Sequence, residues 1–516
     1  MLKDYFERGL ILSPDLPCVI DASTGESMTY READHLAWRV ANALRANGFA
    51  VGDHAAVLSS NDIRAFLTTL AITRAGLIWI PLRPLDGASD LARTLGSFGC
   101  DILFVLSPFE TKAEAIRAEV PRLRTVVTID RATRFNPGLD DWIGQASAAP
   151  LETPYEPESV AAIQATGGTT GAAKGVALSH RSYEYVMASL IALYPARGRP
   201  IFLAALPLTH AAGAIAQSIL ARGGCVVTLP SFDVAAVLEN IPKHQITHLA
   251  AVPAALYKLM DTPGFSETDF SSLQCVSFGG STVSAAKLRH AVEIMGPVFY
   301  NTYGQTEGGM PLTVLGPDDY VIDGQLDEKR LESCGRPGPF NRLRIRRDDG
   351  SFADPNEPGE VVSRSSGTMN CYFENPEATA DVFKDGWLLT GDIGTLDDHG
   401  FLRIVDRKKD MVITGGFNVF PAEIEAVLLS DPTVAEAAVI GVPSERWGEA
   451  IHACIEASSG AIPDTDALIA LCKARLGSIK SPKTIEVLEQ LPRSAVGKLL
   501  KRELRARYWT QVKRSI

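Results

Sequence analysis

The sequence lacks the cysteine pattern of a disulfide-stabilised protein. Its 516 residues include 8 cysteines, which stand far apart, form no C-x-x-C pair and have no histidine at zinc-ligand spacing. A chain of this length can bury several hydrophobic cores, so it needs neither disulfides nor a structural metal to fold. We therefore expect every cysteine to be a buried free thiol, as in proteins of a reducing compartment.

Long apolar runs are missing as well. No stretch approaches the roughly 20 apolar residues that span a bilayer. The first residues include Lys3, Asp4, Glu7 and Arg8 and do not form a signal-peptide core. We therefore expect no membrane span and a cytoplasmic location.

An excess of basic residues is also absent. The 50 lysines and arginines are outnumbered by 61 aspartates and glutamates, which gives a formal net charge of −11. An acidic surface argues against a nucleic-acid partner. A pocket can still be locally positive, so anionic small molecules remain open as substrates.

The apolar pattern that is present predicts an α/β fold. Short apolar runs alternate with helical patterns, and Asp62 is placed to cap one of the helices. Strands are predicted at residues 55–58, 77–80, 101–106, 126–129, 201–206, 225–229, 248–252 and 275–278. Strands that alternate with helices are typical of parallel βαβ units.

Five charged residues in a row, Asp406-Arg407-Lys408-Lys409-Asp410, separate two apolar strands. Such a charged stretch is typical of a domain boundary. We predict a large N-terminal domain over 1–405, a connection at 406–410 and a small α+β domain over 411–516. In the small domain Pro421 occupies the favoured first turn of a helix.

A loop rich in glycine and threonine follows the apolar segment 160–163. Residues 164–175 read Q-A-T-G-G-T-T-G-A-A-K-G, so backbone N–H groups, threonine hydroxyls and Lys174 could surround a phosphate. Ala173 breaks the Walker pattern, and the dinucleotide pattern G-x-G-x-x-G does not occur here. A flexible surface loop is the alternative interpretation.

This loop resembles the phosphate loop of the adenylate-forming superfamily, which includes acyl- and aryl-CoA synthetases, peptide-synthetase adenylation domains and luciferases. The usual form is T-S-G-T-T-G-x-P-K-G, and this chain has Gly167 and Ala173 in place of the usual serine and proline. The resemblance implies that the loop binds ATP phosphates through Thr166, Gly167, Gly168, Thr169, Thr170, Gly171 and Lys174.

Two further motifs follow in the family's order. Residues 206–213, L-P-L-T-H-A-A-G, resemble the segment in which His210 would border the carboxylate pocket, although His210 could also be a core residue. Residues 300–307, Y-N-T-Y-G-Q-T-E, resemble the nucleotide motif. The resemblance implies an α-phosphate contact for Thr306, a magnesium ligand in Glu307, and an adenine site formed by Tyr303, Asn301, Gly304 and Gly280.

The last motifs lie in the C-terminal quarter. By resemblance, Asp392 would contact the ribose and Arg407 the ribose or a phosphate, and Lys409 would be the hinge about which the small domain turns. The CoA-binding residues would be Gly415, Gly416, Asn418 and Trp447, although Trp447 could equally be a core residue. Lys498 would be the catalytic lysine of adenylate formation, although a surface lysine before a helix looks the same alone.

Together the motifs imply an AMP-forming acyl-CoA synthetase that uses ATP and Mg²⁺ and has coenzyme A as co-substrate. Lys498, His210, Thr306 and Glu307 would be its catalytic residues. A carboxylate would attack the α-phosphate of ATP, and the CoA thiol would then attack the acyl-adenylate. The small domain would be mobile and turn about Lys409 between the two steps.

The acid is expected to be hydrophobic. Peptide-synthetase domains place an aspartate where this chain has Ala211, so the ammonium group of an amino acid would lack a partner. The resemblance assigns an acyl pocket with mostly small side chains to His210, Ala211, Ala212, Gly279, Gly280, Gly308, Gly309 and Met310. Small side chains leave room for an aromatic, polycyclic or medium- to long-chain acid.

Two other functions stay open at this point. One is an acyl-AMP ligase that loads a carrier protein, and the other is a catalytically silent relative that only binds nucleotide. We also consider a homodimer as a partner arrangement. A lysine acetyltransferase acting on Lys498 would remove the charge that adenylate formation needs.

Overall fold

The computed structural model describes residues 2–154, 156–166, 174–280, 285–493 and 499–509. Packing divides the chain into two compact units. The first unit is Met1–Leu343 with Ser363–Leu388, and the second is Arg344–Val362 with Leu389–Ile516. The second unit therefore includes residues 344–362 and 389–405, which the sequence had assigned to the large domain. The expected turn of the small domain at 406–410 concerns motion and stays a prediction.

The first unit contains a seven-stranded sheet with the strand order β20-β8-β7-β4-β3-β5-β6. Strands β7, β4, β3, β5 and β6 run parallel, while β8 pairs antiparallel with both β7 and β20. The strands are β3 (His54–Leu58), β4 (Ile78–Pro81), β5 (Ile102–Val105), β6 (Thr125–Thr128), β7 (Val160–Thr166), β8 (Lys174–Ser179) and β20 (Cys371–Tyr372). The predicted parallel βαβ pattern is thus confirmed.

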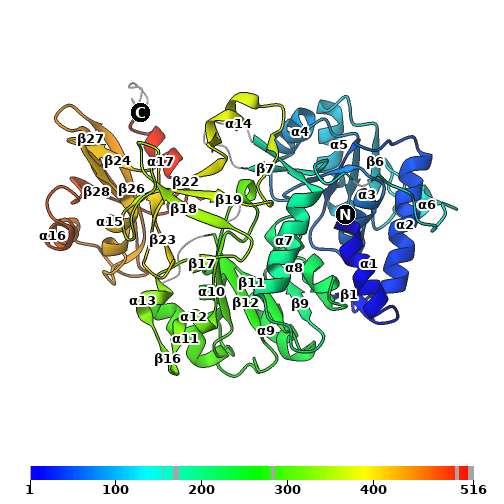
Figure 1. Ribbon diagram of the computed structural model, residues 1–516, viewed down its shortest axis with the longest axis horizontal. Helices are drawn as coiled ribbons and strands as arrows, with labels where there is room; N and C mark the ends of the chain where they lie inside the picture. The colour runs from blue at the N-terminus through cyan, green and yellow to red at the C-terminus, as the bar shows by residue number, and fades with distance from the viewer. Residues whose placement is uncertain (1, 155, 167–173, 281–284, 494–498, 510–516) are drawn as a thin grey trace. The chain divides into compact units, whose positions relative to one another are not determined.

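Helices of the N-terminal region pack beside this sheet (Figure 1). They are α2 (Tyr30–Ala46), α3 (Ile63–Arg74), α4 (Ala88–Ser97), α5 (Glu110–Glu119) and α6 (Leu139–Ile143), with the 3₁₀ turn η1 (Ser107–Phe109). Helix α1 (Leu2–Leu12) packs on α2 and α3. Asp62 caps α3 as predicted, because its side chain accepts a hydrogen bond from the Ala65 amide at 2.8 Å. An N-cap of this kind gives a hydrogen-bond partner to a first-turn amide that the helix itself cannot pair.

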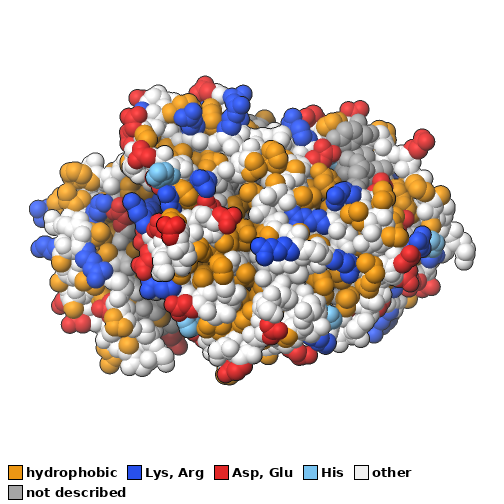
Figure 2. Space-filling view, turned by 60° about the horizontal axis from the view of Figure 1, so that its bottom comes forward, with side chains coloured by type: hydrophobic (Ala, Val, Ile, Leu, Met, Phe, Trp, Pro, Cys, Tyr) orange, Lys and Arg blue, Asp and Glu red, His pale blue; other side chains and the backbone are white. Residues whose placement is uncertain are grey.

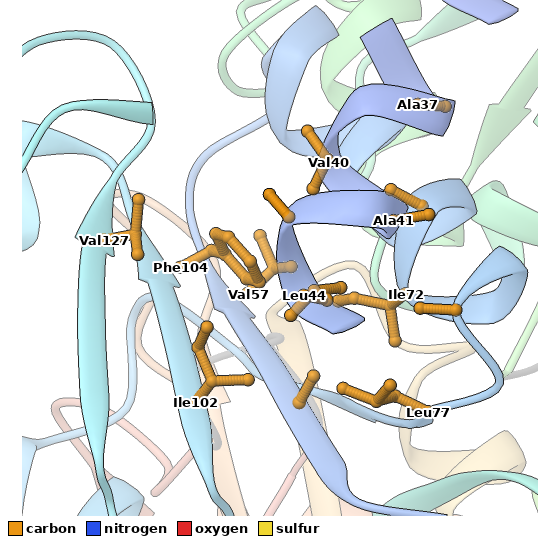
Figure 3. Close-up of a cluster of buried hydrophobic side chains, with 14 of the residues drawn as sticks. Ala37, Val40, Ala41, Leu44, Val57, Ile72, Leu77, Ile102, Phe104 and Val127 are labelled. Carbon is orange, nitrogen blue, oxygen red and sulfur yellow. The ribbon is translucent and has the colours of Figure 1, made fainter. Parts of the chain in front are cut away.

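One hydrophobic core lies between α2, α3 and the parallel strands. Figure 3 shows Val40 and Leu44 of α2 pointing toward Val57 of β3 and Phe104 of β5. On α2 these side chains recur every three or four residues, and on the strands every second residue, so each element presents one apolar face. Burial of these faces fixes the helix layer on the sheet.

A second, nine-stranded sheet has the order β17-β14-β13-β12-β11-β9-β10-β1-β2. Its six central strands are parallel, and β2, β14 and β17 are antiparallel additions. The strands are β1 (Pro17–Asp21), β2 (Ser27–Thr29), β9 (Ile201–Ala204), β10 (Cys225–Thr228), β11 (His248–Ala251), β12 (Cys275–Gly279), β13 (Phe299–Tyr303), β14 (Thr313–Leu315) and β17 (Arg336–Pro337).

Helices α7 and α8 pack together, and α8 also packs on β9 and β10 (Figure 1). The helices that follow β8 in the chain are α7 (His180–Leu193), α8 (Ala211–Leu220), α9 (Val234–Lys243), α10 (Pro253–Met260), α11 (Ala285–Met295), α12 (Pro317–Tyr320), α13 (Glu328–Leu331) and α14 (Pro376–Val382). The 3₁₀ turn η2 (Thr306–Gly308) and the small hairpin β15 (Val321–Ile322) and β16 (Gln325–Leu326) complete this region.

Further strands pair in the order β18-β19-β22-β21, and β23 pairs with β22. They are β18 (Arg342–Arg346), β19 (Gly359–Arg364), β21 (Phe383–Lys384), β22 (Trp387–Leu396) and β23 (Leu402–Arg407). The remaining sheet of the second unit has the order β25-β24-β27-β26 with β28 beside β27. Its elements are β24 (Val412–Thr414), β25 (Phe417–Val419), β26 (Val434–Ser444), β27 (Gly448–Ala457), β28 (Thr484–Leu488), α15 (Pro421–Leu428), α16 (Thr465–Leu476) and α17 (Lys501–Ala506).

Acidic and basic side chains are interspersed over the face that Figure 2 shows. Among the described residues, none of the helices is both long and apolar enough to cross a membrane. All eight cysteines are free thiols and six of them are buried. The expectation of burial is wrong for Cys334 and Cys371, which are partly exposed. Cys371 lies on β20 at the end of its sheet, where only one side of the strand is covered by a neighbour.

The buried Arg74 joins α2 and α3. Its guanidinium pairs with the Asp34 carboxylate, donates to the Asp34 carbonyl at 3.1 Å and lies 4.3 Å from the Trp38 ring centre. Replacing Arg74 by alanine is expected to lower the free energy of unfolding by about 3 kcal/mol, because Asp34 loses its partner and the packing on Trp38 is lost. Urea denaturation followed by tryptophan fluorescence measures this change.

The matched control is Arg93→Ala, which removes an exposed ion pair with Asp90. An exposed pair of this kind contributes at most about 1 kcal/mol, so the control should change stability little. Equal losses for the two variants would contradict the structural role assigned to Arg74.

Candidate functional site

The glycine-rich loop connects two paired strands of the first unit. Thr166 ends β7 and Lys174 begins β8, and the two residues lie opposite each other in the antiparallel ladder. The Thr166 hydroxyl donates to the Lys174 carbonyl at 3.4 Å. The predicted phosphate-binding residues between them, Gly167, Gly168, Thr169, Thr170 and Gly171, lie outside the described residues. The structure therefore places the two ends of the loop.

Lys174 and Glu307 both contact Tyr372. The Lys174 Nζ lies 4.8 Å from the ring centre of Tyr372, and the Tyr372 hydroxyl donates to Glu307 Oε1 at 3.0 Å. Tyr372 is 7% exposed, and β20 holds it beside β8, where it pairs with Val176. Residues that are far apart in the sequence thus form one group.

Electrostatics keep Tyr372 a hydrogen-bond donor. Burial and, to a lesser extent, the charge of Glu307 raise the pKa of the Tyr372 hydroxyl above its ordinary value. The hydroxyl therefore stays protonated near neutral pH. Glu307 is held from its backbone too, because its carbonyl accepts a hydrogen bond from the Met369 amide at 2.8 Å.

Sequence reasoning missed Tyr372. The residue lies in a two-residue strand with no periodic pattern, and its partners are 65 and 198 positions away in the sequence. A tyrosine next to a carboxylate is a relation in space that no local spacing reveals.

The predicted adenine residues lie on or beside β13. The Asn301 side chain donates to the Ser333 carbonyl at 3.2 Å, so its amide is oriented by the loop before β17. Tyr303 ends the strand and lines an apolar pocket, and Thr306 begins the 3₁₀ turn that presents Glu307. Gly304 packs against Met310, since an added Cβ would come within 2.9 Å of Met310 Cγ.

The apolar pocket lies between α7, α8 and the ends of β12 and β13, and the empty space there, open solvent included, is about 380 Å³. Its walls are formed by Val186, Leu190, Tyr194, Ala211, Ala214, Ile215, Ser277, Thr302, Tyr303, Met310 and Pro311. Ala211 and Met310 were predicted from the sequence. His210 precedes α8, and its Nδ1 lies 3.0 Å from the Thr209 hydroxyl.

The other predicted acyl-pocket residues have different surroundings. Ala212 is packed in the hydrophobic core beneath α8. An added Cβ at Gly279 would collide with the backbone of Thr302, and one at Gly309, where φ is +75°, would come within 2.5 Å of the Gly367 carbonyl oxygen. Gly280 follows β12, and Gly308 packs against Leu312. Close approach of backbones thus explains why residues 279 and 309 are glycines. Room for a bulky acyl group is not needed to explain them.

Asp392 and Arg407 of the second unit lie opposite each other on β22 and β23. Arg407 Nε is 3.5 Å from Asp392 Oδ1, and the Asp392 side chain is mostly buried while that of Arg407 is exposed. In the same turn Lys408 pairs with Glu360 at 2.9 Å and Asp410 pairs with Arg505 at 3.0 Å. These ion pairs fix the turn that contains the exposed Lys409.

Three of the predicted CoA residues lie on the hairpin of β24 and β25, with the fourth beside it. The Gly415 amide donates to the Trp447 carbonyl at 2.8 Å, and an added Cβ at Gly415 would approach the Trp447 ring to 2.9 Å. Gly416 forms the turn, and Asn418 and Trp447 are exposed. The structure therefore brings Gly415 and Trp447 together. The predicted catalytic Lys498 lies outside the described residues.

Two groups of side chains contain possible cation ligands. Glu307 suits a hard divalent cation, because Tyr372 binds one carboxylate oxygen and orients the other. His452, Cys454 and Glu486 also lie close together on β27 and β28. Both ring nitrogens of His452 already have partners, the Thr484 hydroxyl at 2.6 Å and the Tyr508 hydroxyl at 2.9 Å, so hydrogen bonding accounts for this second cluster.

Comparison with known proteins identifies two matching family profiles and several similar relatives. The profile of the AMP-binding enzyme family matches residues 6–373, and that of the AMP-binding enzyme C-terminal domain matches residues 423–498. The chain is 35% identical to a medium/long-chain-fatty-acid–CoA ligase, FadD8, of Mycobacterium tuberculosis, over 92% of this chain and 84% of the relative. It is 33% identical to a feruloyl-CoA synthase of an Amycolatopsis species, over 94% of both chains.

A solved structure extends the comparison to the fold. The amide bond synthetase McbA from Marinactinospora thermotolerans is 32% identical and superimposes with a TM-score of 0.88 over 98% of this chain and 99% of the other. The first family profile alone covers more than half of the chain. The protein belongs to the AMP-binding enzyme family.

Proposed function

We propose that the protein is an AMP-forming acyl-CoA synthetase. It uses ATP to convert a hydrophobic carboxylic acid into an acyl-adenylate and then transfers the acyl group to coenzyme A. The group formed by Lys174, Tyr372 and Glu307 carries the proposal, because it places a cation and a carboxylate together at the base of the predicted phosphate loop. The two matched family profiles support it across both parts of the chain.

In the first half-reaction a carboxylate oxygen of the acid attacks the α-phosphorus of ATP, and the bond to pyrophosphate breaks. Lys174 offers positive charge to the phosphates, and Lys498 is proposed to bridge the attacking carboxylate and the α-phosphate. Glu307 is proposed to bind Mg²⁺, which neutralises phosphate charge when it is present. Thr306, the loop residues Thr166–Gly171 and His210 are proposed to position the reacting groups.

In the second half-reaction the CoA sulfur attacks the acyl carbon, and AMP leaves as the carbon–oxygen bond to its phosphate breaks. The glycines at 415 and 416 leave bare backbone beside Trp447, which suits a slender thiol arm. Asp392 is proposed to bind the ribose and Arg407 the ribose or a phosphate. Rotation of the small domain about Lys409 is proposed to remove Lys498 from the reacting groups and to bring Gly415 and Gly416 to them.

The apolar pocket supports a hydrophobic acid. Aliphatic side chains from α7 and α8 form one part of its wall, and Ala211 offers no partner for the ammonium group of an amino acid. Loading of a carrier protein in place of CoA stays an alternative, as does nucleotide binding without catalysis. Formation of a homodimer and a cytoplasmic location remain predictions.

The proposal is tested by pyrophosphate release with ATP and Mg²⁺ over a panel of benzoates, cinnamates, fatty acids and polycyclic acids, each with and without CoA. Turnover with an acyl-CoA product is expected for at least one class of acid. Pyrophosphate release without any thioester product would indicate that the acyl acceptor is a carrier protein or an amine and not CoA. Absence of release from every acid, together with ATP binding, would contradict the proposal in favour of a silent binder.

Lys498→Ala should abolish adenylate formation but still convert a supplied acyl-adenylate to thioester, since only the first step needs its charge. Acetylation of Lys498 by a lysine acetyltransferase should have the same effect. The control is Lys473→Ala, which removes an exposed lysine of α16 and should leave both steps unchanged. Equal loss of both half-reactions would contradict the separate use of Lys498.

Tyr372→Phe keeps the ring beneath Lys174 and removes the hydroxyl that holds Glu307. A hydrogen bond to a charged group is worth about 1.5–3 kcal/mol, so the Mg²⁺ concentration for half-maximal adenylation should rise about tenfold. The control is Tyr320→Phe, which removes a buried hydroxyl bonded to the Phe299 backbone. An unchanged Mg²⁺ dependence in Tyr372→Phe would rule out this positioning role.

A further inference from the structure

Asn61 connects the two large sheets of the first unit at the carboxyl ends of their strands. It follows β3 of the seven-stranded sheet and is 8% exposed. Its side-chain nitrogen donates to the carbonyls of Ala204 and Leu206 at 2.9 Å and of Leu229 at 3.0 Å. Its side-chain oxygen accepts a hydrogen bond from the Leu208 amide at 2.9 Å. Because Ala204 ends β9 and Leu229 follows β10, one side chain holds two strands of the nine-stranded sheet and the turn that leads to α8.

The amide of Asn61 has the combination of groups that this place needs. A side-chain amide offers two N–H hydrogens and one carbonyl oxygen. At residue 61 the two hydrogens serve three backbone carbonyls, and the oxygen serves one backbone N–H. An aspartate of the same shape would keep the acceptor but would turn a carboxylate oxygen toward the three carbonyls. An alanine would leave the buried backbone groups without this partner, which is costly.

Asn61 is itself held in place by the start of α3. The next residue, Asp62, caps this helix through the Ala65 amide, and its carbonyl accepts a hydrogen bond from the Phe66 amide at 3.0 Å. Helix α3 in turn packs against α2 and shares a core with β3. A side chain on such a supported element can hold another segment at a defined position.

The turn that Asn61 holds leads directly to His210 and to the pocket. The His210 amide donates to the Pro207 carbonyl at 3.2 Å, which closes the turn. Helix α8 then begins at Ala211, which lines the pocket. Gly213 of α8 lies so close to the turn that an added Cβ would come within 2.0 Å of the Leu208 carbonyl oxygen. A shift of Leu208 would therefore move both His210 and the first turn of α8.

We propose that Asn61 is a positioning residue for the activation of the acid. It fixes residues 206–210, so that His210 and the start of α8 lie where the carboxylate reacts. This inference rests on the proposed function, which places His210 among the groups that position the reactants. In the described part of the chain Asn61 is not one of the residues that line the pocket, so it acts through His210 and not by contact with the acid.

The test is a double-mutant cycle of Asn61→Ala and His210→Ala, measured by pyrophosphate release below the unfolding temperature of each variant. In the wild-type background Asn61→Ala should lower kcat/KM for the acid at least about tenfold, as for the loss of a buried hydrogen bond. In the His210→Ala background the same substitution should have less than about a threefold effect, because the residue through which it acts is already gone.

The matched control is Asn240→Ala. Asn240 is 4% exposed, and its side chain donates to the Ala236 carbonyl of its own helix α9 at 2.8 Å. This variant should leave kcat/KM for the acid unchanged. Asn61→Ser is a milder second variant, since a hydroxyl can still donate one hydrogen bond, and its kcat/KM should lie between those of the wild type and Asn61→Ala.

Amide hydrogen exchange separates this inference from the proposed function, because it needs no turnover. Exchange in residues 206–210 should become at least about tenfold faster in Asn61→Ala and stay unchanged in Asn240→Ala. Unchanged exchange in Asn61→Ala would overturn the inference whatever the activity. Equal losses of kcat/KM from Asn61→Ala with and without His210 would also overturn it, because that pattern indicates a general structural role. Absence of pyrophosphate release from the wild type with every acid would contradict the proposed function, and the exchange result would then decide the inference alone.

Discussion

The pairing of β20 with β8 is the contact on which the phosphate end of the first unit depends. The two strands are separated by almost 200 residues, and their ladder carries Tyr372 to a place beside Lys174. From there the phenol reaches Glu307, which belongs to the other large sheet region through the turn after β13. A lysine and a glutamate are thus kept near each other without forming a direct ion pair. Both charges stay available for a ligand.

Much of this fold follows from local patterns. The alternation of apolar runs and helices correctly predicted β3, β4, β5 and β6 of the first sheet and β9, β10, β11 and β12 of the second, because a buried parallel strand must be apolar on both faces, whereas β1 and β13 were not predicted. The motifs also pointed to Lys174 and Glu307 from their own neighbours in the sequence. Tyr372 was missed, since its partners Lys174 and Glu307 lie on distant elements.

The structure of the charged run 406–410 is also only partly predictable from its own sequence. Its sequence indicates an exposed turn, and a solvated surface would explain it equally well. In the structure Asp406 accepts a hydrogen bond from the Ala422 amide at 2.9 Å, and Arg407, Lys408 and Asp410 each pair with a different acidic or basic residue. These partners come from positions 15 to 95 residues away. The turn is therefore specified by the tertiary structure of the second unit, which spacing alone does not encode.

The close approach of backbones at Gly279 and Gly309 has a consequence for how this pocket can change over time. Neither glycine can accept a side chain without displacing the main chain of Thr302 or Gly367. Variation in substrate must therefore arise at the side chains that already face the cavity, on α7, α8, β12 and β13 and at Met310. The two glycines fix the path of the main chain, while these lining side chains are the part of the site that can change. Divergence among relatives, and any laboratory redesign of specificity, should accumulate at those side chains.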